Sequence, residues 1–255
     1  MTRLIDSGRR PASSRRGFLA AAIGAAATAL APGVTLYAFG GEAPPVRAPG
    51  EPASAKSRWG LLIDAGKCGD GCDRCVTACR EENGWGDSGP AETRPQWIRK
   101  VSVRDPASGT KSEPPVMCQH CAEPPCVDVC PTGASFKRAD GIVLVDKHIC
   151  IGCRYCMMAC PYKARSFVHA PVDNQKVAAP RGKGTVEGCT LCVDRIDAGK
   201  LPACVAACAS EAGGAMIFGD LNDRESEIAR AAATSATSQL RADLGLDPAL
   251  RYQNL

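Results

Sequence analysis

The sequence of 255 residues lacks the signature motifs of several large enzyme classes. It contains no G-x-S-x-G, no P-loop, no H-E-x-x-H and no G-x-G-x-x-G, and it has only three histidines. These absences argue against a serine hydrolase, a P-loop nucleotide hydrolase, a zinc peptidase and a dinucleotide-dependent dehydrogenase. The formal net charge of +4 includes a basic N-terminal region, so nucleic-acid binding has no support either.

Long apolar stretches are confined to the N-terminal region. Residues 14–19, SRRGFL, are a twin-arginine signature, and an Ala-rich apolar stretch follows to about residue 31. This pattern predicts a signal region over 1–41 that exports the folded protein to the periplasm, followed by a flexible Pro-, Ala- and Gly-rich linker over 42–57. No later stretch is long enough to span a bilayer, so we expect membrane association only through partners.

Cysteine, in contrast, is abundant. Sixteen cysteines form four runs of four with none left over, namely Cys68/Cys72/Cys75/Cys79, Cys118/Cys121/Cys126/Cys130, Cys150/Cys153/Cys156/Cys160 and Cys189/Cys192/Cys204/Cys208. The third run, CIGCRYCMMACP, has the C-x2-C-x2-C-x3-C-P spacing in which three thiolates hold one [4Fe–4S] cluster and the fourth reaches a neighbouring cluster. The other runs are variants with one longer gap. This arithmetic predicts four [4Fe–4S] clusters as cofactors.

Three other uses of the cysteines are open at this point. Disulfides suit an exported protein, but they are typical of short chains that cannot build a core, and 255 residues need no such help. Structural zinc normally takes paired C-x2-C halves, and only the fourth run has that shape. Cys68, Cys72 and Cys75 match the spacing of radical enzymes that keep one iron open for S-adenosylmethionine, although Cys79 and the companion runs favour closed clusters.

Short strands are expected around the cysteine runs. Residues 59–64, WGLLID, are apolar and of strand length, and 136–145 predict a hairpin with an Asp-Gly turn. Further strands are expected at 97–103, 164–169 and 214–218.

These elements predict an α+β fold with two ferredoxin-like two-cluster units and long connecting loops. The inner unit is expected over 115–185, around the second and third runs. The outer unit is discontinuous, over 58–114 and 186–222, and a C-terminal tail follows over 223–255.

Crossed ligation assigns the last cysteine of each run to the other run of its unit. The inner clusters are then expected on Cys118, Cys121, Cys126 and Cys160, and on Cys150, Cys153, Cys156 and Cys130. By analogy, the outer clusters are expected on Cys68, Cys72, Cys75 and Cys208, and on Cys189, Cys192, Cys204 and Cys79.

Several other residues lie close to these runs in the sequence. Four of them are cations, namely Lys147, Arg154, Lys163 and Arg165. Each would raise the reduction potential of a cluster that it lies close to. The alternative is that they are ordinary solvated charges. His120 and His148 are expected to be hydrogen-bonding neighbours rather than ligands, because sixteen thiolates already fill four sites. Trp85 and Trp97 are expected in the core or in a subunit contact.

The tail predicts a helix that begins with Ser226 as its cap, and Leu240, Leu244 and Leu246 follow as a possible apolar edge. This edge could pack on its own domain or on a partner, and our hypothesis is that it helps to hold a partner.

Over residues 59–223 the chain resembles the four-cluster iron–sulfur subunits of the dimethyl-sulfoxide, polysulfide and tetrathionate reductase type. The resemblance rests on the order of the runs, the twin-arginine start, and the stretches PVMCQHCAEPPCVDVCPTGASFKRADGIVLVD, ICIGCRYCMMACPYKARSF and GTVEGCTLCVDRI. Within this family the chain is most similar to the periplasmic iron–sulfur subunits of the Dsr membrane complexes of dissimilatory sulfur metabolism.

The resemblance implies an electron-transfer subunit of a membrane-bound respiratory complex, not an enzyme in itself. Its implied partners are a polytopic quinone-interacting membrane subunit and a multihaem cytochrome c or another redox subunit in the periplasm. The alternatives are the electron-transfer subunit of a molybdopterin reductase and a radical enzyme with an open cluster site.

Overall fold

The chain is described by a computed structural model. The residues that it describes are 51–69, 71–86, 89–106, 109–173, 175–211 and 213–255. The predicted signal region over 1–41 and most of the predicted linker lie outside these residues. Among the described residues, no helix is both long enough and apolar enough to cross a membrane.

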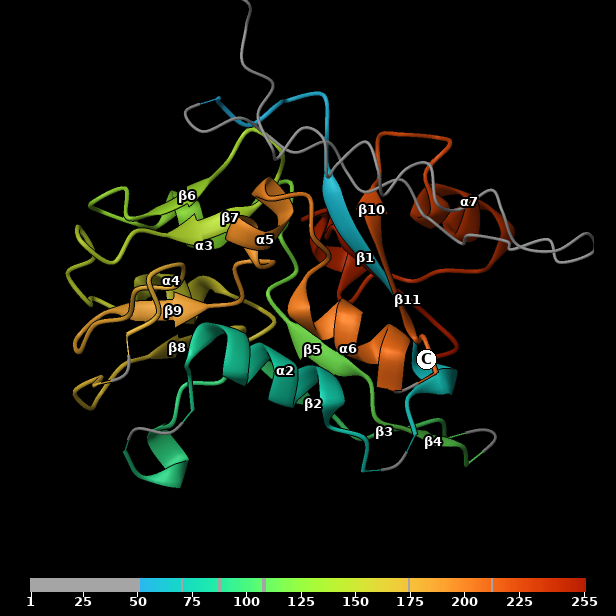
Figure 1. Ribbon diagram of the computed structural model, residues 1–255, viewed down its shortest axis with the longest axis horizontal. Coiled ribbons are helices and arrows are strands. Elements are labelled where there is room, and N and C mark those ends of the chain that lie inside the picture. Colours follow the sequence, from blue (N-terminus) through green and yellow to red (C-terminus); the bar gives the residue numbers. More distant parts are fainter. Residues whose placement is uncertain (1–50, 70, 87–88, 107–108, 174, 212) are drawn as a thin grey trace, which may run out of the picture. The chain divides into compact units, whose positions relative to one another are not determined.

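The described chain is built of short strands and short helices (Figure 1). The strands are β1 Trp59–Asp64, β2 Ile98–Lys100, β3 Val103–Arg104, β4 Lys111–Ser112, β5 Pro115–Met117, β6 Ser135–Lys137, β7 Val143–Val145, β8 Arg165–Phe167, β9 Val186–Gly188, β10 Met216–Asp220 and β11 Leu250–Gln253. The α-helices are α2 Arg74–Asn83, α3 Pro125–Asp128, α4 Tyr155–Ala159, α5 Val193–Asp197, α6 Ala203–Glu211 and α7 Glu227–Thr234. The 3-10 turns are η2 Ala65–Lys67, η3 Ala91–Thr93 and η4 Ala242–Leu244.

A three-stranded sheet has β1 at its centre, between β10 and β11. β10 pairs with β1 in antiparallel register and β11 pairs with it in parallel register. Leu61, Leu62 and Ile63 of β1 are at most 1% exposed, as expected for a continuous apolar run that is covered on both faces. The predicted strand at 59–64 is thus confirmed, and α7 packs against it and against β10.

The other strands form two-stranded antiparallel ladders. β6 and β7 form the predicted hairpin, with Gly141 in the left-handed region at its turn. The segment 97–103 is not one strand as expected. It divides into β2, which pairs with β5, and the first residue of β3, which pairs with β4.

The cysteine-bearing helices pack in pairs. α2, from the first cysteine run, contacts α6, from the fourth run, and α3 and α4 of the second and third runs contact each other (Figure 1). Each of these helices contains the third cysteine of its run, and the fourth follows four residues later, one helical turn on. The packing therefore brings cysteines of distant runs together.

The C-terminal tail is part of the sheet. The predicted helix is confirmed as α7, where the Ser226 hydroxyl caps the helix by accepting a hydrogen bond from the Ala229 N–H at 3.2 Å. The chain then returns to form β11, which the sequence analysis missed. Leu240 and Leu246 pack against the core, and Leu244 is 40% exposed. This packing favours docking of the tail on its own domain over our hypothesis that it holds a partner.

Tyr252 of β11 anchors this arrangement. Its ring is fully buried, and its hydroxyl donates a hydrogen bond to the Pro115 carbonyl at 3.1 Å. We expect Tyr252→Ala to lower stability by about 3–5 kcal/mol through the cavity that it leaves. Tyr252→Phe should cost only about 1 kcal/mol, for the hydrogen bond. The measurement is the denaturant midpoint for loss of visible cluster absorbance without oxygen, and equal midpoints for the two variants would contradict this account.

Gly152 lies between the first two cysteines of the third run, where the backbone makes a close approach. Its φ is +71°, and a Cβ atom would stand 2.2 Å from the Gly184 carbonyl oxygen. Gly133 is a matched control, because its φ is +69° but a Cβ atom there would meet nothing within 4 Å.

We expect Gly152→Ala to displace this loop and to remove about four irons per chain, the content of one cluster. Gly133→Ala should keep its iron and cost roughly 1–2 kcal/mol for the left-handed backbone alone. Iron content and thermal stability of the two variants check this prediction, and equal behaviour would show that the close approach is unimportant.

Candidate metal centres

All sixteen cysteines lie among the described residues, and none of them forms a disulfide. Nine are buried and only Cys153 is exposed. Burial raises the pKa of the Cys118 and Cys121 thiols to about 12, and it raises the pKa of Cys204 well above the ordinary value. Such thiols become thiolates only beside a strong positive charge, which a bound metal supplies.

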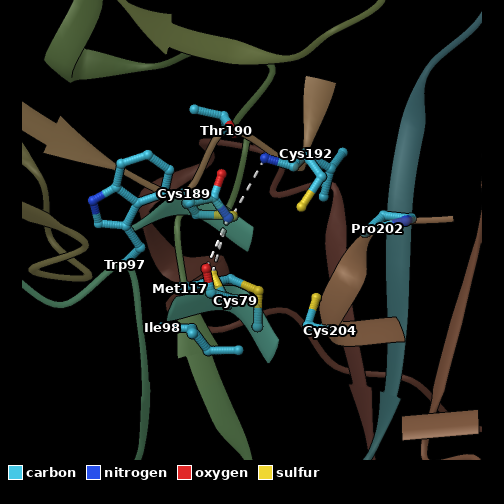
Figure 2. A pocket seen from close by; sticks show the side chains of 11 residues that line it. Cys79, Trp97, Ile98, Met117, Cys189, Thr190, Cys192, Pro202 and Cys204 are labelled. Atoms are coloured by element: carbon cyan, nitrogen blue, oxygen red, sulfur yellow. Dashed lines mark hydrogen bonds between the residues drawn. The ribbon is translucent and has the colours of Figure 1, made fainter. Parts of the chain in front are cut away.

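One set of cysteines lines a single cavity. It consists of Cys79, Cys189, Cys192 and Cys204, here named the Cys79 set. Figure 2 shows their sulfur atoms around one common space, with Trp97, Ile98 and Met117 beside it. The set joins α2 to three cysteines of the fourth run.

Two further sets each line a cavity of their own. The Cys121 set consists of Cys118, Cys121, Cys126 and Cys160. The Cys153 set consists of Cys130, Cys150, Cys153 and Cys156. Each of them combines three cysteines of one run with the last cysteine of the other.

The remaining four cysteines, Cys68, Cys72, Cys75 and Cys208, interact electrostatically and are named the Cys72 set. Burial raises the pKa of Cys75 to about 11, Lys100 opposes this rise, and the charges of the other three cysteines add to it. These are the four sets that the crossed pattern named. That each set holds one cluster stays a prediction.

The loop before the second cysteine has the same backbone conformation in every run. The residue directly preceding that cysteine has a positive φ, which is 71° at Gly71, 43° at His120, 71° at Gly152 and 55° at Leu191. Side-chain-bearing residues rarely adopt this conformation. A left-handed residue in such a loop is typical of the concave backbone nests that bind anions, iron–sulfur clusters included.

The last cysteine of every run accepts a hydrogen bond at its sulfur. In three runs the donor is a backbone N–H: Ser135 donates to Cys130 at 3.3 Å, Ala164 to Cys160 at 3.5 Å and Ala215 to Cys208 at 3.2 Å. In the first run the indole N–H of Trp85 donates to Cys79 at 3.3 Å. Hydrogen bonds to sulfur are one of the factors that set cluster potentials.

The two tryptophans are buried, as expected for core residues. Trp97 lines the cavity of the Cys79 set. The sulfur contact of Trp85 was missed, because a tryptophan six residues after a cysteine carries no sequence signal of a hydrogen bond to it.

His120 is confirmed as a hydrogen-bonding neighbour. Its Nδ1 accepts a hydrogen bond from the Val143 N–H at 3.0 Å, and burial, together with the charge of Arg165, lowers its pKa to about 3. The ring is therefore neutral. His148 is exposed, and its backbone N–H donates to the Asp146 carboxylate.

The four cations named from the sequence lie in different surroundings. Arg165 is only 7% exposed and donates from Nη2 to Cys126 Sγ at 3.1 Å. Lys147 lies over the ring of Trp97, and burial lowers its pKa. Arg154 lies over the ring of Phe167, and both Arg154 and Lys163 are exposed. Within the described part of the chain, only Arg165 of these four donates to a cysteine sulfur.

The donor groups fit [4Fe–4S] clusters. Each set offers four thiols, and soft thiolate ligands suit iron–sulfur clusters. In three of the sets the surrounding cavity is lined without any carboxylate or imidazole side chain. Among the described residues, no three Cys, His, Asp or Glu side chains lie close enough together to bind a single metal ion. A bound cluster would supply one-electron redox chemistry at each set.

Comparison with known proteins agrees with this chemistry. A family model described as a 4Fe-4S dicluster domain matches residues 113–221. The chain is 40% identical to the Hdr-like menaquinol oxidoreductase iron-sulfur subunit 1 of Archaeoglobus fulgidus, and the match covers 80% of this chain and 86% of that protein. It is 41% identical to a sulfite dehydrogenase subunit of Allochromatium vinosum, over 75% of this chain and 81% of that protein.

A third relative is a tetrathionate reductase subunit of Salmonella typhimurium, which is 42% identical over 69% of this chain and 63% of that protein. All three matches are longer than the dicluster domain, and each relative is a subunit of an oxidoreductase. The chain therefore belongs to the family of [4Fe–4S] ferredoxin-type subunits of oxidoreductase complexes, in which it binds multiple [4Fe–4S] clusters as an electron-transfer subunit and not as the catalytic one.

Proposed function

We propose that the protein relays electrons through four [4Fe–4S] clusters, one in each cysteine set. The relay connects a polytopic quinone-interacting membrane subunit to a periplasmic redox partner in sulfur metabolism, on the outer face of the cytoplasmic membrane. The observation that carries the proposal is the unbranched order in which the four sets adjoin one another.

The outer two sets share a pair of helices. On α2, Cys75 belongs to the Cys72 set and Cys79 to the Cys79 set. On α6, Cys208 belongs to the Cys72 set and Cys204 to the Cys79 set. The Cys72 set and the Cys79 set are therefore neighbours.

The inner two sets share the α3 and α4 segments in the same manner. Cys126 and Cys130 belong to different sets, and so do Cys156 and Cys160. Cys118 of the Cys121 set and Cys189 of the Cys79 set line one further cavity, which joins the inner pair to the outer pair. The order is thus the Cys72, Cys79, Cys121 and Cys153 sets.

Exposure follows this order. In the two middle sets six of the eight cysteines are buried, whereas in the two end sets only Cys75, Cys208 and Cys156 are buried. A relay needs shielded clusters inside and accessible clusters at its ends, where electrons enter and leave. The exposure pattern supports two opposite points of exchange.

Apolar side chains are exposed around the end of the order at Cys153. Ile149, Ile151, Tyr155 and Met158 are 49%, 67%, 56% and 72% exposed. Exposed apolar groups of this size mark interaction surfaces. We assign this face to the membrane subunit, because that partner is the most apolar and has to reach an accessible cluster.

The cellular setting rests on the sequence and on the relatives' names. The twin-arginine signature supports export of the folded, cluster-bearing protein to the periplasm. One relative is named for menaquinol and two for sulfite and tetrathionate. Together with the resemblance to DsrO, the iron–sulfur subunit of Dsr complexes, they support a quinone-linked complex of sulfur metabolism with a multihaem cytochrome c as periplasmic partner.

A second candidate is the relay of a molybdopterin reductase, which the relative named tetrathionate reductase supports equally. A radical enzyme with an open iron site has less support, because Cys208 lies with Cys68, Cys72 and Cys75 and offers a fourth thiolate.

Purification from the native membrane tests the partners. We expect a C-terminally tagged chain, isolated in mild detergent without oxygen, to bring down a polytopic membrane protein and a multihaem cytochrome, identified by mass spectrometry. A molybdopterin protein in place of the cytochrome would select the second candidate. Isolation of the chain alone would contradict both.

The same purification tests the docking face. Ile151→Glu combined with Met158→Glu should reduce the yield of the membrane protein at least tenfold, because each places a charge in an apolar contact. The control is Leu244→Glu in η4, which alters an exposed apolar residue of the tail. Loss of the membrane protein in the control alone would instead favour the tail as its docking site.

Paired substitutions test the crossed sets. Cys118→Ala with Cys160→Ala removes two ligands from one set, so we expect one reduced-cluster signal to be lost in electron paramagnetic resonance spectra. Cys150→Ala with Cys160→Ala removes one ligand from each of two sets, so two signals should change. Ligation within sequential runs would give the opposite pattern.

A further inference from the structure

Arg165 is a buried positive charge between the two inner cysteine sets. It is the first residue of β8, and its partner strand places Gly188 opposite it. A Cβ atom at Gly188 would stand 3.8 Å from Arg165 Cγ and 2.8 Å from the Ala164 carbonyl oxygen, so glycine leaves this site open. The guanidinium lines the cavity of the Cys121 set and donates to Cys126 Sγ at 3.1 Å.

Two other guanidinium groups, one buried and one half-buried, have carboxylate partners. Arg181 is buried with Glu187, to which it donates from Nε and Nη2 at 2.9 Å. Arg138 pairs in the same way with Asp140 and Asp197. The protein thus neutralises these two groups with carboxylates.

Arg165 has no such partner among the described residues. Its guanidinium donates to the sulfur of Cys126, and its Nη1 is buried without a hydrogen-bond acceptor among the described residues. Lys147 lines the neighbouring cavity together with Arg165 and adds a second positive charge. An unpaired buried guanidinium is strongly unfavourable, so this site requires negative charge from another source.

The thiolates that act on Arg165 come from both inner sets. They are Cys126 and Cys118 of the Cys121 set and Cys156 of the Cys153 set. A [4Fe–4S] cluster with four thiolate ligands is an anion, and each electron that it accepts makes it more negative. A fixed positive charge beside two such clusters therefore favours the reduced form of both.

We propose that Arg165 is the shared counter-charge of the two inner clusters, those of the Cys121 and Cys153 sets, and that it raises the reduction potentials of both relative to the outer pair. This inference rests on the proposed cluster assignment. An error in that assignment would appear in the paired cysteine substitutions, whereas an error about Arg165 appears only in the potentials.

The experiment is a redox titration of the complete complex, followed by electron paramagnetic resonance, with the potential of each cluster as the readout. Arg165→Met removes the charge and keeps most of the side chain's length. Arg165→Lys keeps the charge but loses the planar fork of donors. Arg230→Met is the matched control, because it removes the same charge from an exposed side chain of α7.

In Arg165→Met we expect the potentials of the two inner clusters to move to more negative values by more than those of the two outer clusters, of which the Cys79 set contributes Cys189 to a cavity that Arg165 also lines. Arg165→Lys should move the same two potentials by less, and Arg230→Met should move none. Four unchanged potentials in Arg165→Met, or an equal shift of all four, would overturn the proposal. If Arg165→Met loses iron, Arg165→Gln, which also removes the charge but keeps a polar side chain, decides by the same criterion.

Discussion

Coordination of buried cysteine sulfur is the interaction on which the rest of the fold depends. The helices and strands are short, and α3 has only four residues, so local propensity cannot hold them. Instead, cysteines stand among the apolar residues of each core cluster, such as Cys75, Cys79, Cys204 and Cys208 in the largest. The thiols of Cys75, Cys79 and Cys204 resist ionisation without metal, because burial raises their pKa. Folding and cluster insertion are therefore one coupled process, in keeping with the export in the folded state that we propose.

The crossed arrangement also places the four sets in the order that we propose as the electron path. The third and fourth cysteines of a run lie four residues apart, in or just after one of these helices, and they belong to two neighbouring sets. Each packed helix pair therefore places two sets beside each other. Cys118 and Cys189, which line one cavity, then join the inner sets to the outer ones. The environment differs along this path. The Cys79 set has an indole donor in Trp85, and the Cys121 set has the guanidinium of Arg165. Such differences are the means by which a protein sets distinct potentials on chemically identical clusters.

Much of this organisation could be predicted from local patterns. The cysteine spacing predicted the four sets, and the apolar run over 59–64 predicted β1. The Asp-Gly turn predicted the hairpin of β6 and β7, and Ser226 predicted the start of α7. The pairing of the tail with β1 could not be predicted. β11 alternates buried and half-buried residues over only four positions, too few for a periodic signal, and its place beside β1 depends on contacts some 190 residues apart. Arg165 was one of four cations that the sequence named, but it could not be singled out, because the sequence does not show which cations lack a carboxylate.

The most direct test of the central claim is anomalous diffraction at the iron absorption edge from anaerobically grown crystals of the protein. The account predicts four groups of iron per chain, each enclosed by one crossed set and arranged in the order of the Cys72, Cys79, Cys121 and Cys153 sets. Fewer groups, or groups enclosed by the four cysteines of a single sequential run, would contradict it.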